Sequence, residues 1–198
     1  MWHYDAKVSL LRLSCRFTKE QLEKAHPIPG LYTKLPSMSA FNDTRSALDR
    51  RTLLFYTTVG DMPPINEAPT LHAAAHIYAS DRNSLEMIAH HCGFDKTRGA
   101  MSSLSFMIIF HTTPSGYAFQ ESAARPGQDG AEQWYIQEVS GDRLADGRGN
   151  HRSRIFDRNG QHVATTLQDG LIRIKFRDEA EAKRVLDGLR SSKETAKL

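Results

Sequence analysis

Three polar residues have side chains that could activate or hold a water molecule. Asp81 lies where a helix is expected to begin, so its carboxylate could act as a general base beside the free N–H groups of a helix N-terminus. Asp is also a preferred N-cap residue, and position alone favours that structural role. Gln168 precedes Asp169-Gly170 in an apolar β pattern; its amide could orient a water, although the segment also fits an ordinary turn or bulge. Ser103 begins an apolar strand and has no distinguishing context of its own.

Histidines near the middle of the chain raise the question of a metal site. His90 and His91 precede Cys92, while His72 and His76 have the i, i+4 spacing of one helical face. Adjacent helical residues point about 100° apart, so His90 and His91 cannot easily face one ion. No HExxH or CxxC spacing, phosphate-binding loop or dinucleotide fingerprint occurs in the sequence. We therefore expect no metal and no cofactor.

One strand and one helix should position Asp81. Residues 53–59 are rich in β-branched and aromatic side chains and predict a strand. The segment after Asp81 has apolar residues at i, i+3, i+4 and i+7, which is typical of a helix buried along one side; they are Leu85, Ile88, Ala89 and Cys92. Gly93 marks the expected end of this helix.

The second half of the chain has the period of β-strands. Strands are expected at residues 104–111, 133–139, 149–156 and 161–167, the last of which continues into 171–176. The pair Asn159-Gly160 is the preferred sequence for a type I′ hairpin turn. These strands form an antiparallel meander that follows the long helix.

The two ends of the chain are less regular. Residues 8–13 could form a short strand, 18–24 a helix, and the Pro- and Gly-containing stretch 26–42 a loop. Residues 178–190 predict a further helix. A curled antiparallel sheet wrapped around one central helix accounts for the order of strands and helices along the chain, so the expected fold class is α+β.

Four segments of the chain resemble the type II acyl-CoA thioesterases, the double-hotdog enzymes that include the bacterial TesB protein and peroxisomal thioesterases. Tyr78–Leu85 resembles the family's "YASDxxFL", and the strand that ends at Phe110-His111 resembles "SLDHxxxFH". Gly147–Gly160 resembles "GRGLxxGRIFDRDG", and Leu167–Arg173 resembles "xQEGLIR". The segments occur in the family's order between about residues 51 and 177.

The resemblance implies a hotdog fold and hydrolysis of an acyl-CoA substrate to free acid and CoA, without a metal or a cofactor. The family's water-holding residues fall on Asp81, Ser103 and Gln168, which we expect to be catalytic. The resemblance also places one glycine-containing segment in substrate binding, namely Gly147, Arg148 and Gly149. Asp81 and Gln168, each structural when read alone, are thus expected to act as a pair.

Three departures from the family keep other functions open. Ser105-Phe106 replaces the family's Asp-His pair, and the polar stretch 112–131 is longer than the family's loop. The family joins two hotdogs in one chain, whereas only the second is recognisable here. The alternatives are therefore a non-catalytic acyl-thioester-binding module and a hotdog hydratase or dehydratase.

The expected organisation has three parts. Residues 1–48 form an N-terminal segment and linker, residues 49–177 a single hotdog domain, and residues 178–198 a C-terminal helix and tail. Because the chain carries one hotdog, we expect a homodimer in which a second copy replaces the missing half. The final residues Ala196-Lys197-Leu198 are a close variant of the Ser-Lys-Leu signal, which predicts a peroxisomal location, with the cytoplasm as the alternative.

Charge and hydropathy argue against two classes of partner. The chain has 26 Lys and Arg against 23 Asp and Glu, interspersed, so its formal charge of +3 gives no reason to expect a nucleic acid. The longest apolar run is residues 106–110, whereas a bilayer span needs about 20 apolar residues. We therefore expect no membrane span.

Overall fold

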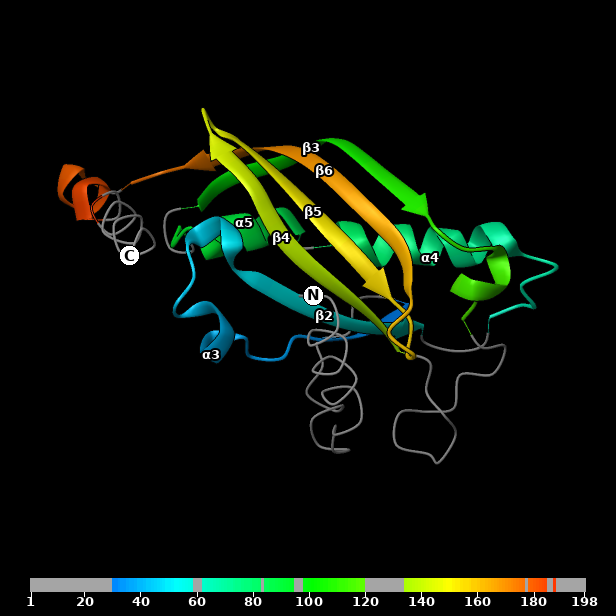
Figure 1. The fold of residues 1–198 in the computed structure, drawn as a ribbon. Helices are drawn as coiled ribbons and strands as arrows, with labels where there is room; N and C mark the ends of the chain where they lie inside the picture. Colours follow the sequence, from blue (N-terminus) through cyan, green and yellow to red (C-terminus); the bar gives the residue numbers. More distant parts are fainter. Residues whose placement is uncertain are drawn as a thin grey trace.

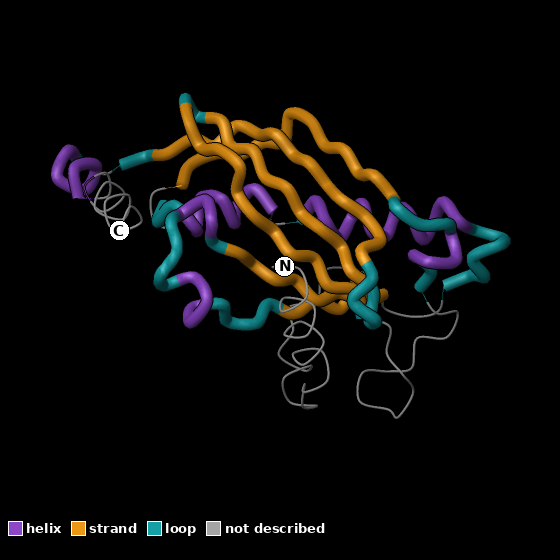
Figure 2. The backbone as a smooth tube through the Cα atoms, in the orientation of Figure 1, coloured by secondary structure: helices purple, strands orange, loops and turns teal. Residues whose placement is uncertain are grey.

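The computed structural model describes residues 30–58, 62–82, 84–94, 98–119, 134–176, 178–184 and 187. These residues form a six-stranded antiparallel sheet that curls around two helices lying end to end, as Figure 1 and Figure 2 show. The strand order is β1-β2-β4-β5-β6-β3, so β3 lies at one edge. The strands are β1 (Leu31–Lys34), β2 (Arg51–Thr58), β3 (Arg98–Phe110), β4 (Tyr135–Ala145), β5 (Arg148–Phe156) and β6 (His162–Ile174). The helices are α3 (Ser39–Asn42), α4 (Pro69–Asp81) and α5 (Ser84–His91), with 3₁₀ turns η1 (Ala47–Asp49) and η2 (Pro114–Tyr117).

A pair of glycines allows α5 to lie close to the sheet. Gly149 of β5 and Gly170 of β6 are directly opposite each other. A Cβ on Gly170 would lie 2.4 Å from Leu85 Cδ1 of α5, and a Cβ on Gly149 would lie 3.2 Å from Ile88 Cδ1 of the same helix. Because neither glycine carries a side chain, α5 packs tightly on the strand that holds Gln168. The sheet wrapped around a central helix confirms the expected hotdog architecture.

Two fully buried histidines anchor α4. His76 Nδ1 accepts a hydrogen bond from the Tyr56 hydroxyl at 2.7 Å, and His76 Nε2 donates to the Tyr117 carbonyl at 2.8 Å. His72 Nδ1 accepts the Phe119 backbone N–H at 3.0 Å. Burial lowers the pKa of His76 from 6.5 to about 4, so the imidazole is neutral near pH 7. These histidines hold the helix in the core.

The stretch expected to be a loop at 26–42 contains two elements instead. In it, β1 pairs with β2 from Leu31↔Thr58 onward, and α3 follows. Leu31 is 2% exposed, so non-local pairing and burial override the local Pro and Gly signals. The prediction of a structureless loop was therefore wrong at these positions.

The helix boundary near Asp81 also differs from the prediction. Asp81 is the last residue of α4, and α5 begins at Ser84, so Asp81 is not an N-cap that starts one long helix. The backbone of Arg82 is extended (ψ 125°) and separates the two helices. The predicted end is confirmed: Gly93 has φ +77°, and the Phe94 N–H bonds the Ala89 carbonyl at 2.8 Å.

The type I′ hairpin turn lies between β4 and β5, not at the predicted position between β5 and β6. Asn159 does not have a positive φ, so Asn159-Gly160 is not a type I′ turn. The loop is held instead by Asp157 Oδ1, which accepts hydrogen bonds from the N–H groups of Asn159 (2.9 Å) and Gln161 (2.7 Å). The I′ geometry occurs between β4 and β5, where Asp146-Gly147 has φ values of 55° and 72°. The strands predicted by periodicity are confirmed as β2 to β6. As expected, β6 is continuous, and it runs through Gln168-Asp169-Gly170 without a turn.

The described part of the C-terminal helix begins as expected. Residues 179–184 are helical, and Asp178 Oδ1 accepts the Glu181 N–H at 2.8 Å, which caps the helix start. The predictions for residues 8–13 and 18–24, most of 112–131, and the tail lie outside the described residues. Within the described ranges, no helix is long and apolar enough to cross a membrane.

Candidate active site

The structure brings the three predicted catalytic residues into contact from three separate elements. Asp81 ends α4, Ser103 lies on the edge strand β3, and Gln168 lies on β6. Gln168 Nε2 donates to Asp81 Oδ1 at 2.5 Å and to Ser103 Oγ at 2.6 Å. The amide therefore ties a carboxylate and a hydroxyl to one another at the break between the two helices.

Exposure divides these three residues into two kinds. The Asp81 and Ser103 residues are exposed, whereas Gln168 is 3% exposed. A ligand can thus reach the carboxylate and the hydroxyl, while the amide holds them from inside the sheet. This arrangement fits a site that holds and deprotonates a water molecule.

A buried row of polar side chains supports the end of α4 next to Asp81. Gln137 of β4 is 1% exposed, and its Nε2 donates to the Ser80 carbonyl at 3.1 Å and to Ser153 Oγ at 2.9 Å. Ser153 in turn shares a short hydrogen bond with Thr166 of β6. The row gives the final turn of α4 a partner on the sheet, which fixes where Asp81 leaves the helix.

A β-bulge interrupts β3 directly after Ser103. Ser103 pairs with Gly170 while Ser105 pairs with Asp169, so Leu104 is an extra residue in the ladder. Side chains alternate between the two faces of a strand, and an extra residue reverses that alternation. Ser103 and Phe106, although three positions apart, therefore both lie on the Gln168 face of the sheet.

His151 is a residue of this site that the sequence reasoning missed. It lies directly across from Gln168 in the β5–β6 ladder and is 1% exposed. Its Nε2 lies 2.6 Å from Gln168 Oε1. Desolvation by burial lowers the pKa of His151, and the Gln168 hydrogen bond opposes this in part. Alternation along 149–156 predicts an inward side chain at 151, but only the strand register shows that it meets Gln168.

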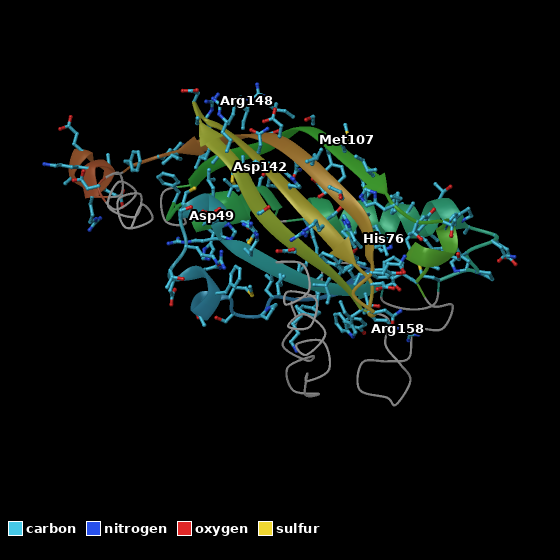
Figure 3. All side chains as sticks on the ribbon, viewed as in Figure 1. Asp49, His76, Met107, Asp142, Arg148 and Arg158 are labelled. Atoms are coloured by element: carbon cyan, nitrogen blue, oxygen red, sulfur yellow. The ribbon has the colours of Figure 1, made fainter. Side chains whose placement is uncertain are left out.

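The predicted substrate-binding residues lie at the β4–β5 turn rather than with the three residues in contact. Gly147 completes the turn, and Gly149 packs under α5 as described above. Arg148 forms an ion pair with Asp169, on the face opposite Gln168, and lies at the end of the sheet in Figure 3. Their role in binding a substrate stays a prediction.

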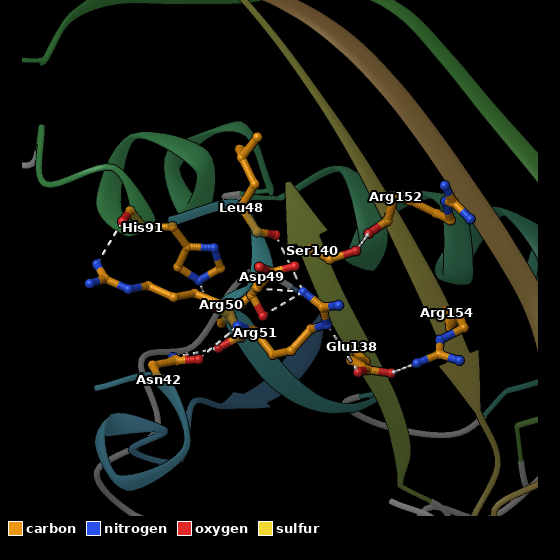
Figure 4. Close-up of polar contacts among 11 residues, drawn as sticks. Asn42, Leu48, Asp49, Arg50, Arg51, His91, Glu138, Ser140, Arg152 and Arg154 are labelled. Carbon is orange, nitrogen blue, oxygen red and sulfur yellow. Dashed lines mark hydrogen bonds and ion pairs between the residues drawn. The ribbon is translucent and has the colours of Figure 1, made fainter. Parts of the chain in front are cut away.

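A second polar cluster lies on the outer face of β2, β4 and β5 (Figure 4). Glu138 there contacts Arg51 at 3.5 Å and Arg154 at 2.6 Å. Arg51 also donates to the Asp49 carbonyl at 2.7 Å, which ties η1 to β2. This cluster braces the sheet surface and has no contact with Gln168. Among the described residues, no group of three or more His, Cys, Asp or Glu could hold a metal ion.

Comparison with known families accounts for this arrangement. The model of the acyl-CoA thioesterase C-terminal domain family matches residues 45–172, which include β2 to β5, both long helices and Gln168. The chain belongs to this family. The match confirms the resemblance to TesB-type thioesterases and includes Asp81 and Ser103 as well.

Solved structures of this thioesterase class share the fold at low sequence identity. An acyl-CoA thioesterase II TesB2 from Mycobacterium marinum is 20% identical with a TM-score of 0.53, over 78% of this chain and 56% of that one. A tesB protein from Mycobacterium avium subspecies paratuberculosis is 16% identical with a TM-score of 0.51, over 80% of this chain and 56% of that one. The chain thus spans little more than half the length of these proteins. No curated protein sequence matches it.

Proposed function

We propose that the protein hydrolyses acyl-CoA thioesters to a free acid and CoA, with Asp81, Ser103 and Gln168 as its catalytic residues. Membership of the acyl-CoA thioesterase family supports the reaction class. The observation that carries the proposal is the pair of hydrogen bonds from Gln168 Nε2 to Asp81 and Ser103. A purely structural role at the end of α4 would not require Asp81 to have a partner 87 residues away on another strand.

Each residue has a distinct part in the reaction. Asp81 accepts a proton as the water oxygen attacks the thioester carbonyl carbon, and the Ser103 hydroxyl helps to direct that water. Gln168 holds Asp81 and Ser103 next to each other through its two hydrogen bonds. Backbone N–H groups in the first turn of α5, which begins three residues after Asp81, stabilise the negative charge on the carbonyl oxygen. The C–S bond then breaks, and the proton passes from Asp81 to the CoA sulfur.

A free-thiol assay with purified protein tests this proposal. Acyl-CoA esters from acetyl to palmitoyl would be incubated with the full chain, and released CoA would be measured with a thiol reagent. We expect release that depends on protein concentration and is lost in Asp81→Asn. Tight binding without release would instead identify an acyl-thioester-binding module. Water addition to an enoyl-CoA, followed by its ultraviolet absorbance, would identify a hydratase.

The edge of the sheet supports a homodimer as the active form. β3 is an edge strand, and its outer side chains are apolar and exposed: Leu104 at 50%, Met107 at 54% and Ile109 at 43% (Met107 is labelled in Figure 3). An unpaired apolar edge favours association with another strand. We expect a particle of about twice 22.3 kDa by light scattering, with specific activity falling on dilution. A fully active monomer would contradict this part of the proposal.

Two finer parts of the proposal concern the substrate and the compartment. Gly147, Arg148 and Gly149 would contact the CoA portion, so Arg148→Ala should raise KM more than it lowers kcat. The C-terminal Ala196-Lys197-Leu198 would direct the protein to peroxisomes. A protein tagged at its N-terminus should co-localise with a peroxisomal marker and become cytosolic when these three residues are removed.

A further inference from the structure

The buried side chain of His151 holds the carbonyl end of the Gln168 amide. Its Nε2 is 2.6 Å from Gln168 Oε1, and the two residues are opposite each other on neighbouring strands. Gln168 Nε2 is turned the other way, toward Asp81 and Ser103. A continuous chain of hydrogen bonds therefore runs from His151 through the amide to the exposed groups.

The contacts of the imidazole define its tautomer. Gln168 Oε1 can only accept a hydrogen bond, so His151 Nε2 must carry the hydrogen. His151 Nδ1 is buried and has no hydrogen-bond partner among the described residues. A proton on Nδ1 would be a buried donor without a partner, which is unfavourable, whereas a bare lone pair at Nδ1 costs less. The neutral Nε2–H form thus satisfies both nitrogen atoms best.

The geometry points to His151 as a positioning residue of the catalytic site: its Nε2–H fixes the Gln168 amide so that both amide hydrogens are directed at Asp81 and Ser103. This inference rests on the proposed thioesterase function. The amide has two ends of nearly equal size, and the reversed orientation would place its oxygen against the Asp81 carboxylate. His151 excludes that orientation because its own donor requires an oxygen at the near end.

Removal of the donor should disturb the site without emptying the core. In His151→Phe, an aromatic ring occupies the place of the imidazole, but Gln168 Oε1 loses the hydrogen bond from His151 Nε2. The amide then turns or shifts to find another donor, and it releases Asp81 and Ser103. His151→Gln is the matched variant, because its amide N–H can reach the place of Nε2 and restore the donation.

Kinetics of the two variants test the inference. We expect His151→Phe to lower kcat by about 10- to 100-fold with KM changed less than about threefold, because displaced catalytic groups slow the reaction without weakening acyl-CoA binding. We expect His151→Gln to recover most of kcat. Equal kcat values in the wild type and His151→Phe would overturn the inference, as would equal losses in both variants.

An NMR measurement keeps the inference testable whatever the activity. With ¹⁵N-labelled histidine in the full-length wild-type protein, His151 should show a protonated Nε2 and a bare Nδ1 near pH 7. A proton on Nδ1 would refute the role of His151, even if His151→Phe failed to fold. A wild type that releases no CoA but shows the Nε2–H tautomer would reject the proposed function and leave the His151–Gln168 contact established.

Discussion

Protonation of His76 should make the fold markedly less stable in mild acid. The imidazole is fully buried between the Tyr56 hydroxyl and the Tyr117 carbonyl, and burial lowers its pKa from 6.5 to about 4. Between these two values the unfolded chain binds a proton at this site and the folded chain does not. Stability therefore falls as pH decreases from about 6.5 to about 4.

The size of the effect follows from the difference in proton affinity. One pKa unit corresponds to about 1.4 kcal/mol, so a change from 6.5 to about 4 lowers the free energy of unfolding by about 3 kcal/mol once pH is below 4. Between pH 7 and pH 5 the loss is about 2 kcal/mol. That is a large part of the about 5–15 kcal/mol that stabilises a typical domain.

Urea unfolding of the wild type and His76→Gln at pH 7 and pH 5 isolates this contribution. Gln offers an acceptor and a donor to Tyr56 and Tyr117 but does not titrate. The variant should be less stable at pH 7, and its deficit should shrink by about 2 kcal/mol at pH 5. His90→Gln, the same substitution at an exposed histidine of α5, is the control for the effect of a His-to-Gln change itself. Parallel pH profiles for wild type and His76→Gln would refute the reasoning.

Other changes test the site and its supports. Asp81→Asn should abolish thioester hydrolysis with an unchanged unfolding midpoint, because Asn keeps an oxygen for the Gln168 bond but cannot take a proton from water; wild-type rates would return Asp81 to a structural role. Gly170→Ala should lower the free energy of unfolding, measured with urea, by about 1–3 kcal/mol, because the new Cβ would lie 2.4 Å from Leu85 Cδ1. An unchanged unfolding midpoint would contradict the close approach of α5. Gln137→Leu should lower the free energy of unfolding by about 1–3 kcal/mol and also lower kcat, because the Ser80 carbonyl loses its hydrogen-bond donor. A loss of stability without a loss of kcat would show that Gln137 does not position Asp81.

The parts of this fold that local sequence determines were predictable. The i, i+3, i+4, i+7 stripe of α5 and the strand periods of β2 to β6 report burial along single elements, and the structure confirms them. Resemblance to a family located Asp81, Ser103 and Gln168, and the structure shows that they touch.

The missed features depend on non-local contacts. β1 forms because Leu31 pairs across to β2, which overrides its Pro- and Gly-rich surroundings. The contact of His151 with Gln168 requires the β5–β6 register, and that register depends on a loop held by the Asp157 carboxylate rather than on the expected type I′ turn. Periodicity gives the face on which a side chain lies but not its neighbour on the next strand.

The extra residue in β3 has a consequence for how this edge of the sheet meets other chains. Deletion of Leu104 would leave Ser103 opposite Gly170 and Ser105 opposite Asp169, so both halves of the strand would keep their partners. The deletion would remove only the bend that the bulge puts into β3. The edge of the sheet would then be a longer straight strand with free backbone groups beside the exposed Met107 and Ile109. Such an edge accepts further strands without limit. The bulge therefore shortens the straight part of this apolar edge with which a strand of another chain could pair.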